Sequence, residues 1–252
     1  MSAQISSKLT EVADGFQIHS ASSLDARFLY REIFEGGTYA ELPLPDEPFV
    51  IDVGANIGLF TLFVKRRRPK ARVLAFEPIP DLVAALRANV ERFSLDQVSV
   101  HERALGSEER DDVEFTYYPL LPSSSTLFPQ DQGQLRELLS RSFPPKVVDR
   151  MFQGRQVPVR IDRLGPHLDG ERPVDLLKID AVGSELAVLR GIEERQWPLL
   201  RSVFIDVQDV DGRVDEVCAR LRLMGLDAAV GVPPASAEGG DGLNYVIHAV
   251  RP

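Results

Sequence analysis

Short, continuously apolar segments alternate along this chain with stretches whose apolar residues recur at helical spacing. The apolar segments are FVIDV at 49–53, RVLAFE at 72–77, VSVHER at 98–103, VDLLKID at 174–180 and SVFIDV at 202–207. A strand that is apolar throughout is buried on both faces, and helices that separate such strands cover a parallel sheet. The alternation therefore predicts an α/β fold with a doubly wound, Rossmann-like sheet.

Helical spacing also occurs before the first apolar segment, in LDARFLYREIFE at 24–35. Gly36 and Gly37 end this predicted helix, and three prolines then favour an extended approach to the first strand. The chain of 252 residues is compatible with one large domain. We therefore expect a helical lead-in of residues 1–48, packed on a domain of residues 49–252.

The alternation is interrupted between about 107 and 172, where the chain holds TYYPLLPSSSTL and a polar helical stretch around 131–141. Long excursions of this kind often carry binding residues. We expect an insertion over the ligand edge of the sheet that forms part of a substrate pocket. A peripheral structural excursion is the alternative.

Composition excludes several classes of protein. The formal charge of −9 argues against non-specific nucleic-acid binding, which needs a basic surface. No window approaches about 20 consecutive apolar residues, so we expect no membrane span. The N-terminus has no apolar signal core, and Cys218 is the single cysteine, expected in the core. We therefore expect a cytoplasmic protein.

One dense basic run, KRRRPK at 65–70, follows the first predicted helix of the sheet. It is typical of a solvated helix C-terminus, where cations complement the dipole and Pro69 stops the helix. A docking patch for an acidic carrier protein or another biosynthetic partner is the alternative.

A glycine-rich turn, DVGANIG at 52–58, follows the first strand. Its glycines allow a tight turn and close approach to a ligand, but it lacks the G-x-G-x-x-G pattern and a P-loop lysine. The turn suits the amino-acid part of a cofactor, with Asp52 meeting an ammonium directly or through water. Glu77 ends the second strand, where an acid typically accepts hydrogen bonds from ribose hydroxyls. Together the two motifs predict an adenosine-type cofactor.

Five segments in this order resemble the FkbM-type methyltransferases: VIDVGANIGLFTLF, AFEPIPDLVAALRANV, YYPLLPSSSTL, LLKIDAVGSELAVLRGI and DVQDVDGRVDEV. The likeness runs from Phe28 to Tyr245 and is greatest to the O-methyltransferase group of polyketide and nonribosomal peptide pathways. It implies a seven-stranded methyltransferase sheet, S-adenosyl-L-methionine as cofactor, and a hydroxyl acceptor on a small or carrier-tethered natural-product intermediate.

The resemblance also implies roles for individual positions. The cofactor would be bound by the loop after the first strand, by Glu77, by Asp180 at the end of LLKID, and by residues at matching positions elsewhere. The complete cofactor set is Tyr39, Asp52, Gly54, Ala55, Asn56, Gly58, Glu77, Ser125, Thr126 and Asp180. Asp180 would also lie beside the acceptor.

The acceptor side departs from the family. Where relatives commonly read valine-glutamate-valine-histidine, this chain has Ile205-Asp206-Val207-Gln208, and Val182 replaces a frequent acid. Glutamine positions a substrate but cannot act as a base. Three interpretations stay open: Asp180 or Asp206 is the base, the acceptor is an acidic enol, phenol or carboxylic acid, or transfer is lost. The catalytic candidates are Asp180, Asp206 and Gln208.

The histidines do not restore the missing base. His19, His101 and His248 are expected to be structural, and His167 is the one that could reach the pocket. Scattered histidines and one cysteine predict no metal site. An S-adenosylmethionine-binding domain without catalysis, acting as a scaffold, is the alternative function, and the glycine pattern disfavours a NAD-dependent oxidoreductase.

Overall fold

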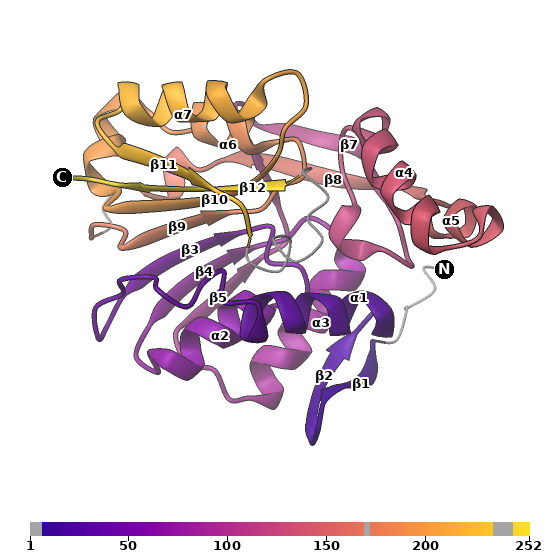
Figure 1. Cartoon of the computed structure of the whole chain (residues 1–252). Helices are drawn as coiled ribbons and strands as arrows, with labels where there is room; N and C mark the ends of the chain where they lie inside the picture. The colour runs from indigo at the N-terminus through magenta and orange to yellow at the C-terminus, as the bar shows by residue number, and fades with distance from the viewer. Residues whose placement is uncertain (1–6, 169–171, 234–243) are drawn as a thin grey trace.

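The computed structural model describes residues 7–168, 172–233 and 244–252. Its main sheet has seven strands in the order β11-β12-β10-β9-β3-β4-β5 (Figure 1). The strands span β3 Phe49–Val53, β4 Arg72–Phe76, β5 Val98–His101, β9 Leu176–Ile179, β10 Ser202–Gln208, β11 Asp227–Gly231 and β12 Asn244–Val250. The predicted apolar strands are therefore present, and the doubly wound fold is confirmed.

Strand direction defines where this sheet can bind a ligand. β3 pairs in parallel with β4 on one side and with β9 on the other, whereas β12 is antiparallel to both β10 and β11. The chain starts at β3, winds outward through β4 to β5, and returns to β9. The order therefore reverses between β3 and β9, and ligands of such sheets bind beside the carboxyl ends of the strands at this point.

Helices cover both faces of the sheet (Figure 1). On one face lie α1 Ser23–Tyr30, α2 Leu59–Arg67 and α3 Pro80–Arg92, and on the other α6 Glu185–Arg190 and α7 Arg213–Leu223. Each layer encloses its own apolar core. Cys218 is buried on the inner face of α7, as its helical spacing with Val214 and Leu221 predicts.

The lead-in contains a β-hairpin that the sequence analysis missed. β1 Lys8–Ala13 pairs with β2 Phe16–Ser20, and His19 lies within this hairpin, where its backbone N–H donates to Asn89. The predicted helix at 24–35 is present as α1 followed by a π-helical turn, Arg31–Glu35. Residues 1–6 lie outside the described part of the chain.

The excursion after β5 forms a second, three-stranded sheet from β6 Ala104–Gly106, β7 Arg110–Tyr117 and β8 Arg155–Arg163. Between β7 and β8 lie α4 Gly133–Ser142, α5 Pro145–Met151 and two short 3₁₀ turns. The Thr126 hydroxyl donates to the Val182 carbonyl at 2.7 Å and so ties this excursion to the loop after β9. Residues 169–171 of the predicted insertion are outside the described residues.

The basic run at 65–70 makes structural contacts that composition did not predict. Arg67 donates to the Ala40 carbonyl at 2.8 Å, and Arg68 donates to the carbonyls of Leu44 and Pro45. The ammonium of Lys65, a buried residue, donates to the Ala71 carbonyl at 2.9 Å. The predicted helix C-terminus is present, since α2 ends at Arg67, and Arg67 and Arg68 also fasten the lead-in to this end of α2.

Candidate active site

The glycine loop between β3 and α2 is locked to its neighbouring strands. The N–H groups of Gly54 and Ala55 both donate to the Phe76 carbonyl, at 3.0 and 2.9 Å. Gly54 has φ 72°, and a Cβ at this position would overlap the Asp180 carbonyl oxygen. The loop after β3 and the end of β9 therefore approach each other closely only because residue 54 is glycine.

Gly58 was expected to allow close approach of a ligand, but it does not line the cavity, and its contacts are with a neighbouring helix. It begins α2 with φ 87°, and a Cβ there would overlap the Leu86 side chain of α3. This glycine lets two helices pack together beneath the loop.

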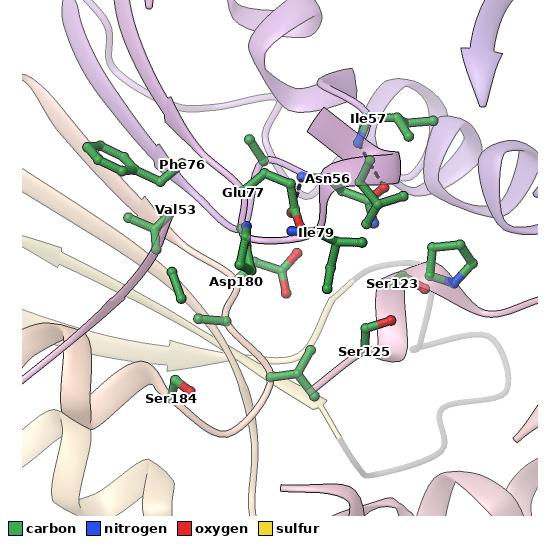
Figure 2. A pocket seen from close by; sticks show the side chains of 18 of the residues that line it. Val53, Asn56, Ile57, Phe76, Glu77, Ile79, Ser123, Ser125, Asp180 and Ser184 are labelled. Atoms are coloured by element: carbon green, nitrogen blue, oxygen red, sulfur yellow. Dashed lines mark hydrogen bonds between the residues drawn. The ribbon is translucent and has the colours of Figure 1, made fainter. Parts of the chain in front are cut away.

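Glu77 lies at the end of β4, beside the loop, and lines a cavity at the carboxyl ends of the strands (Figure 2). One carboxylate oxygen accepts from the Asn56 N–H and the other from the Ile79 N–H, both at 2.9 Å. Burial raises the pKa of Glu77 to about 7. Because each oxygen has a second lone pair, the carboxylate can accept two further hydrogen bonds from a ligand.

Lys178 is a buried residue of β9 that the sequence analysis did not assign. Its ammonium lies 3.1 Å from the Asp52 carboxylate and 3.7 Å from that of Asp180, and it donates to the Gly54 carbonyl at 3.0 Å. Burial opposes its charge, but the two carboxylates raise the pKa of Lys178 above its ordinary value. The signal was a lysine within an otherwise apolar strand, since a buried lysine needs charged partners.

Asp52 is fully buried beneath this network, and it does not line the cavity. Its carboxylate accepts from the Thr61 hydroxyl at 2.8 Å and pairs with Lys178. The structure therefore does not support direct contact of Asp52 with a cofactor ammonium, and contact through water stays a prediction. In this structure Asp52 holds Lys178, and the carboxylate that reaches the cavity is that of Asp180.

The excursion after β5 forms the wall of this first cavity that lies opposite the ends of the strands. Ser123 and Ser125 line it across from Glu77 and Asp180 (Figure 2). The Ser125 hydroxyl also accepts from the Tyr118 N–H at 3.1 Å. Gly54, Ala55 and Asn56 line the same cavity.

Besides Asp52 and Gly58, two more of the expected cofactor residues, Tyr39 and Thr126, do not line this cavity. Tyr39 is buried among Phe60, Phe63 and Phe204. The Thr126 hydroxyl donates to Val182 and accepts from the Phe128 N–H. Tyr39 therefore packs in the core, and Thr126 holds loops together, and neither forms part of the cavity wall.

A second cavity adjoins the first, with which it shares Leu29, Ser123, Asp180 and Val182. Asp206 and Gln208, at the end of β10, line it, so the structure brings all three catalytic candidates to one space. Burial and the nearby Asp180 carboxylate raise the pKa of Asp206 well above its ordinary value.

Three more acids that the sequence analysis did not identify line this second cavity: Asp25 and Glu32 from the lead-in helix and Glu185 from the start of α6. The Ser123 hydroxyl donates to Asp25 at 2.6 Å. Burial raises the pKa of Asp25 to about 6 and the pKa values of Glu32 and Glu185 to about 7. Helical periodicity could not reveal these residues, because it carries no information about which helix end faces the cavity.

His167 is not a member of either cavity. Its ring packs edge-on against Phe76 and His101, and its Nε2 lies 3.9 Å from Asp162. The suggestion that it could reach the pocket is therefore not supported. Within the described ranges, no cluster of three His, Cys, Asp or Glu residues could hold a metal ion, and no helix is both long and apolar enough to cross a bilayer.

The fold and the site together define the structural class of this protein. A seven-stranded α/β sheet, with a glycine loop after β3 and an acid after β4, is the architecture of Rossmann-like methyltransferases. A solved structure with this fold is the methyltransferase FkbM from Methylobacillus flagellatus, with a TM-score of 0.55 and 13% identity, which covers 90% of this chain and 51% of that chain.

Sequence comparison defines the family. The model of the methyltransferase FkbM domain matches residues 52–225. Methyltransferase sdnD of Sordaria araneosa is 36% identical over 85% of this chain and 87% of its own length. The 31-O-demethyl-FK506 methyltransferase FkbM of Streptomyces tacrolimicus is 35% identical over 89% of this chain and 90% of its own length. The chain belongs to the FkbM methyltransferase family and is an S-adenosylmethionine-dependent methyltransferase.

Proposed function

We propose that this enzyme methylates a hydroxyl group of a natural-product intermediate. The observation that carries the proposal is the position of Asp180, which lines both cavities, and of Asp206, which lines the second cavity with it. The first cavity is the cofactor side, because the loop at 54–56 and Glu77 line it. The second cavity is then the acceptor side. The name of the relative from Streptomyces tacrolimicus, a 31-O-demethyl-FK506 methyltransferase, supports an oxygen acceptor.

The residues of the first cavity fit S-adenosylmethionine. Glu77 would accept hydrogen bonds from the ribose hydroxyls, and Asp180 would attract the ammonium group of the methionine part. The loop at 54–56 leaves its backbone open to close approach, and Ser123 and Ser125 would close the opposite wall. When bound there, the cofactor supplies an electrophilic methyl group on a sulfonium.

The chain's own residues would orient the acceptor and remove its proton. Lys178 holds the Asp180 carboxylate at the junction of the cavities. Asp206 would accept the hydroxyl proton, because a base is most effective when its pKa lies near the working pH, and the surroundings raise the pKa of Asp206. Gln208 would hydrogen-bond the acceptor without taking a proton.

We further propose that the acceptor is a small or carrier-tethered molecule and that the enzyme works in the cytoplasm. The single, buried Cys218 supports a reducing compartment. A biosynthetic-complex partner would then present the acceptor at the second cavity.

Methyl transfer can be measured with a cofactor labelled on its methyl group and a panel of apolar compounds that each carry both a hydroxyl and a carboxyl group. A product that resists alkaline hydrolysis is an ether and supports a hydroxyl acceptor, whereas an alkali-labile product is an ester and contradicts it. Binding of S-adenosylhomocysteine without methyl transfer to any compound would favour the alternative, a cofactor-binding domain without catalysis. The argument for that alternative is that Gln208 stands where relatives have histidine.

A further inference from the structure

The second cavity carries an unusual charge pattern. Five of the described residues that line it are acidic, namely Asp25, Glu32, Asp180, Glu185 and Asp206, and none of its described lining residues is Lys, Arg or His. Lys178, the cation beneath the site, lines the first cavity and is paired with Asp52 and Asp180. The described lining of this cavity therefore offers a negatively charged acceptor no cation with which to pair.

Two buried polar atoms of this cavity have no partner within the described structure. They are Glu185 Oε2 and Gln132 Nε2, and both side chains are almost completely buried, with 1% and 4% of the residue exposed. The other oxygen of Glu185 accepts from the Gly183 N–H at 2.8 Å. Burial of a polar atom without a partner is unfavourable, so two such atoms on residues that line one cavity indicate a ligand that completes them.

The remaining wall of the cavity is apolar. Leu135, Leu138 and Leu139 of α4 line it, although α4 has no fully buried residue. Phe28 of α1, which is 62% exposed, lines the same cavity. A helix that directs leucines into a cavity, without burying them in the protein core, suits an acceptor with an apolar body.

We propose that this cavity selects an uncharged acceptor that carries a second hydroxyl group, bound by Glu185 and Gln132, in addition to the hydroxyl that is methylated. Glu185 Oε2 needs a hydrogen-bond donor, and Gln132 Nε2 needs an acceptor. A hydroxyl group provides both, whereas an ammonium group only donates and a carboxylate only accepts. Glu185 and Gln132 are then specificity residues, and the inference rests on the proposed function because it assumes that the second cavity is the acceptor side.

The proposal can be tested with cyclohexanols that differ only in the group opposite the hydroxyl. The series is cyclohexanol, trans-cyclohexane-1,4-diol, trans-4-aminocyclohexanol and trans-4-hydroxycyclohexanecarboxylate, measured by saturation-transfer NMR on the full chain with S-adenosylhomocysteine bound. We expect the diol to bind most tightly and the carboxylate most weakly, with a ratio of at least roughly tenfold.

Two variants separate this recognition from general effects. Glu185→Gln should reduce the discrimination against the carboxylate, and Gln132→Leu should remove the advantage of the diol over cyclohexanol. Glu194→Gln, which makes the same charge change on the surface, should do neither. Should Glu185→Gln fail to fold, the Gln132→Leu comparison alone decides the result.

The outcomes for the two proposals are distinct. Failure of the wild-type chain to bind S-adenosylhomocysteine would overturn the proposed function itself. If S-adenosylhomocysteine binds, but the carboxylate binds as tightly as the diol or the diol does not bind at all, the proposal for Glu185 and Gln132 is wrong.

Discussion

The Lys178 ammonium lies 3.1 Å from the Asp52 carboxylate, and 4% and 0% of these two side chains are exposed. An ion pair at this depth stabilises a fold only while both partners are present, because either one alone would be a buried, uncompensated charge. The pair also fixes the position of Asp180, the neighbour of Lys178 that reaches the cavities. Stability and the geometry of the site therefore depend on the same lysine.

We expect Lys178→Met to lower the free energy of unfolding by about 3–5 kcal/mol, because it leaves Asp52 unpaired in the core. Lys70→Met is the matched control, since Lys70 pairs with Glu47 on the surface and its loss should change stability little. Urea denaturation followed by circular dichroism measures both. The double variant Lys178→Met/Asp52→Asn should recover part of the loss, and equal stability of the two single variants would contradict the role of the pair.

Gly54→Ala should destabilise the protein by roughly 1–3 kcal/mol or more, because residue 54 has positive φ and a Cβ would overlap the Asp180 carbonyl oxygen. Gly15→Ala is the control, since Gly15 also has positive φ but no atom lies near its Cβ position. Thermal and urea unfolding compare the two. Losses of equal size would show that the contact with Asp180 adds nothing to the backbone strain.

Stability without ligand should fall as pH rises from about 5 to about 8, because buried acids have raised pKa values. Burial raises the pKa of Glu32, Glu77 and Glu185 from 4.5 to about 7. In this window the folded state keeps protons that the unfolded state has lost, so unfolding releases protons and is favoured at higher pH. Differential scanning fluorimetry should show a falling melting temperature, with a smaller slope in Glu32→Gln. A melting temperature that rises over this range would contradict the burial of these acids.

If Asp206 removes the acceptor proton, Asp206→Asn should slow methylation of a neutral alcohol by roughly 10²–10⁴-fold. Its rate should rise with pH in the wild type, since the base must be deprotonated and its pKa is raised. The affinity for S-adenosylhomocysteine should change much less, which calorimetry can establish. A full rate in both Asp206→Asn and Asp180→Asn would remove both carboxylates as the base.

Gln208→His tests the same question from the opposite direction. Gln208 lines the second cavity with Asp206, so an imidazole there would add a base with an ordinary pKa of about 6.5. We expect turnover of unactivated alcohols to increase as this imidazole deprotonates. The initial rate as a function of pH measures the effect, and no gain at any pH would indicate that position 208 does not reach the acceptor proton.

Much of the fold could be predicted because its strands are continuous apolar runs. FVIDV and RVLAFE cannot be half-exposed, so they had to lie between layers of helices. The hairpin β1-β2 was missed although Asp14-Gly15 stands between its strands, a pair typical of tight β-turns. The strands β6, β7 and β8 could not be placed, because β8 pairs with segments that lie far before it in the sequence.

Some residues of the site could likewise be predicted from the sequence, and others could not. Glu77 and Asp180 follow strands, so the order of the sheet brings them to one edge, and the sequence was sufficient to place them. The ion pair of Asp52 was not predicted, because its partner Lys178 lies 126 positions away and only the pairing of β3 with β9 brings the two together. Glu32, Glu185 and Gln132 reach the second cavity through packing of helices from three different parts of the chain. No local pattern encodes that packing.

The central claim is that the cavity beside Glu77 binds S-adenosylmethionine, and calorimetric titration with S-adenosylhomocysteine tests it most directly. We expect one molecule to bind per chain, and Glu77→Ala to weaken binding by about 1–3 kcal/mol, because hydroxyl groups of the ligand would lose their acceptor. Glu194→Ala, on the surface, should leave the affinity unchanged. Absence of binding to the wild-type chain, or an unchanged affinity in a folded Glu77→Ala variant, would contradict the account.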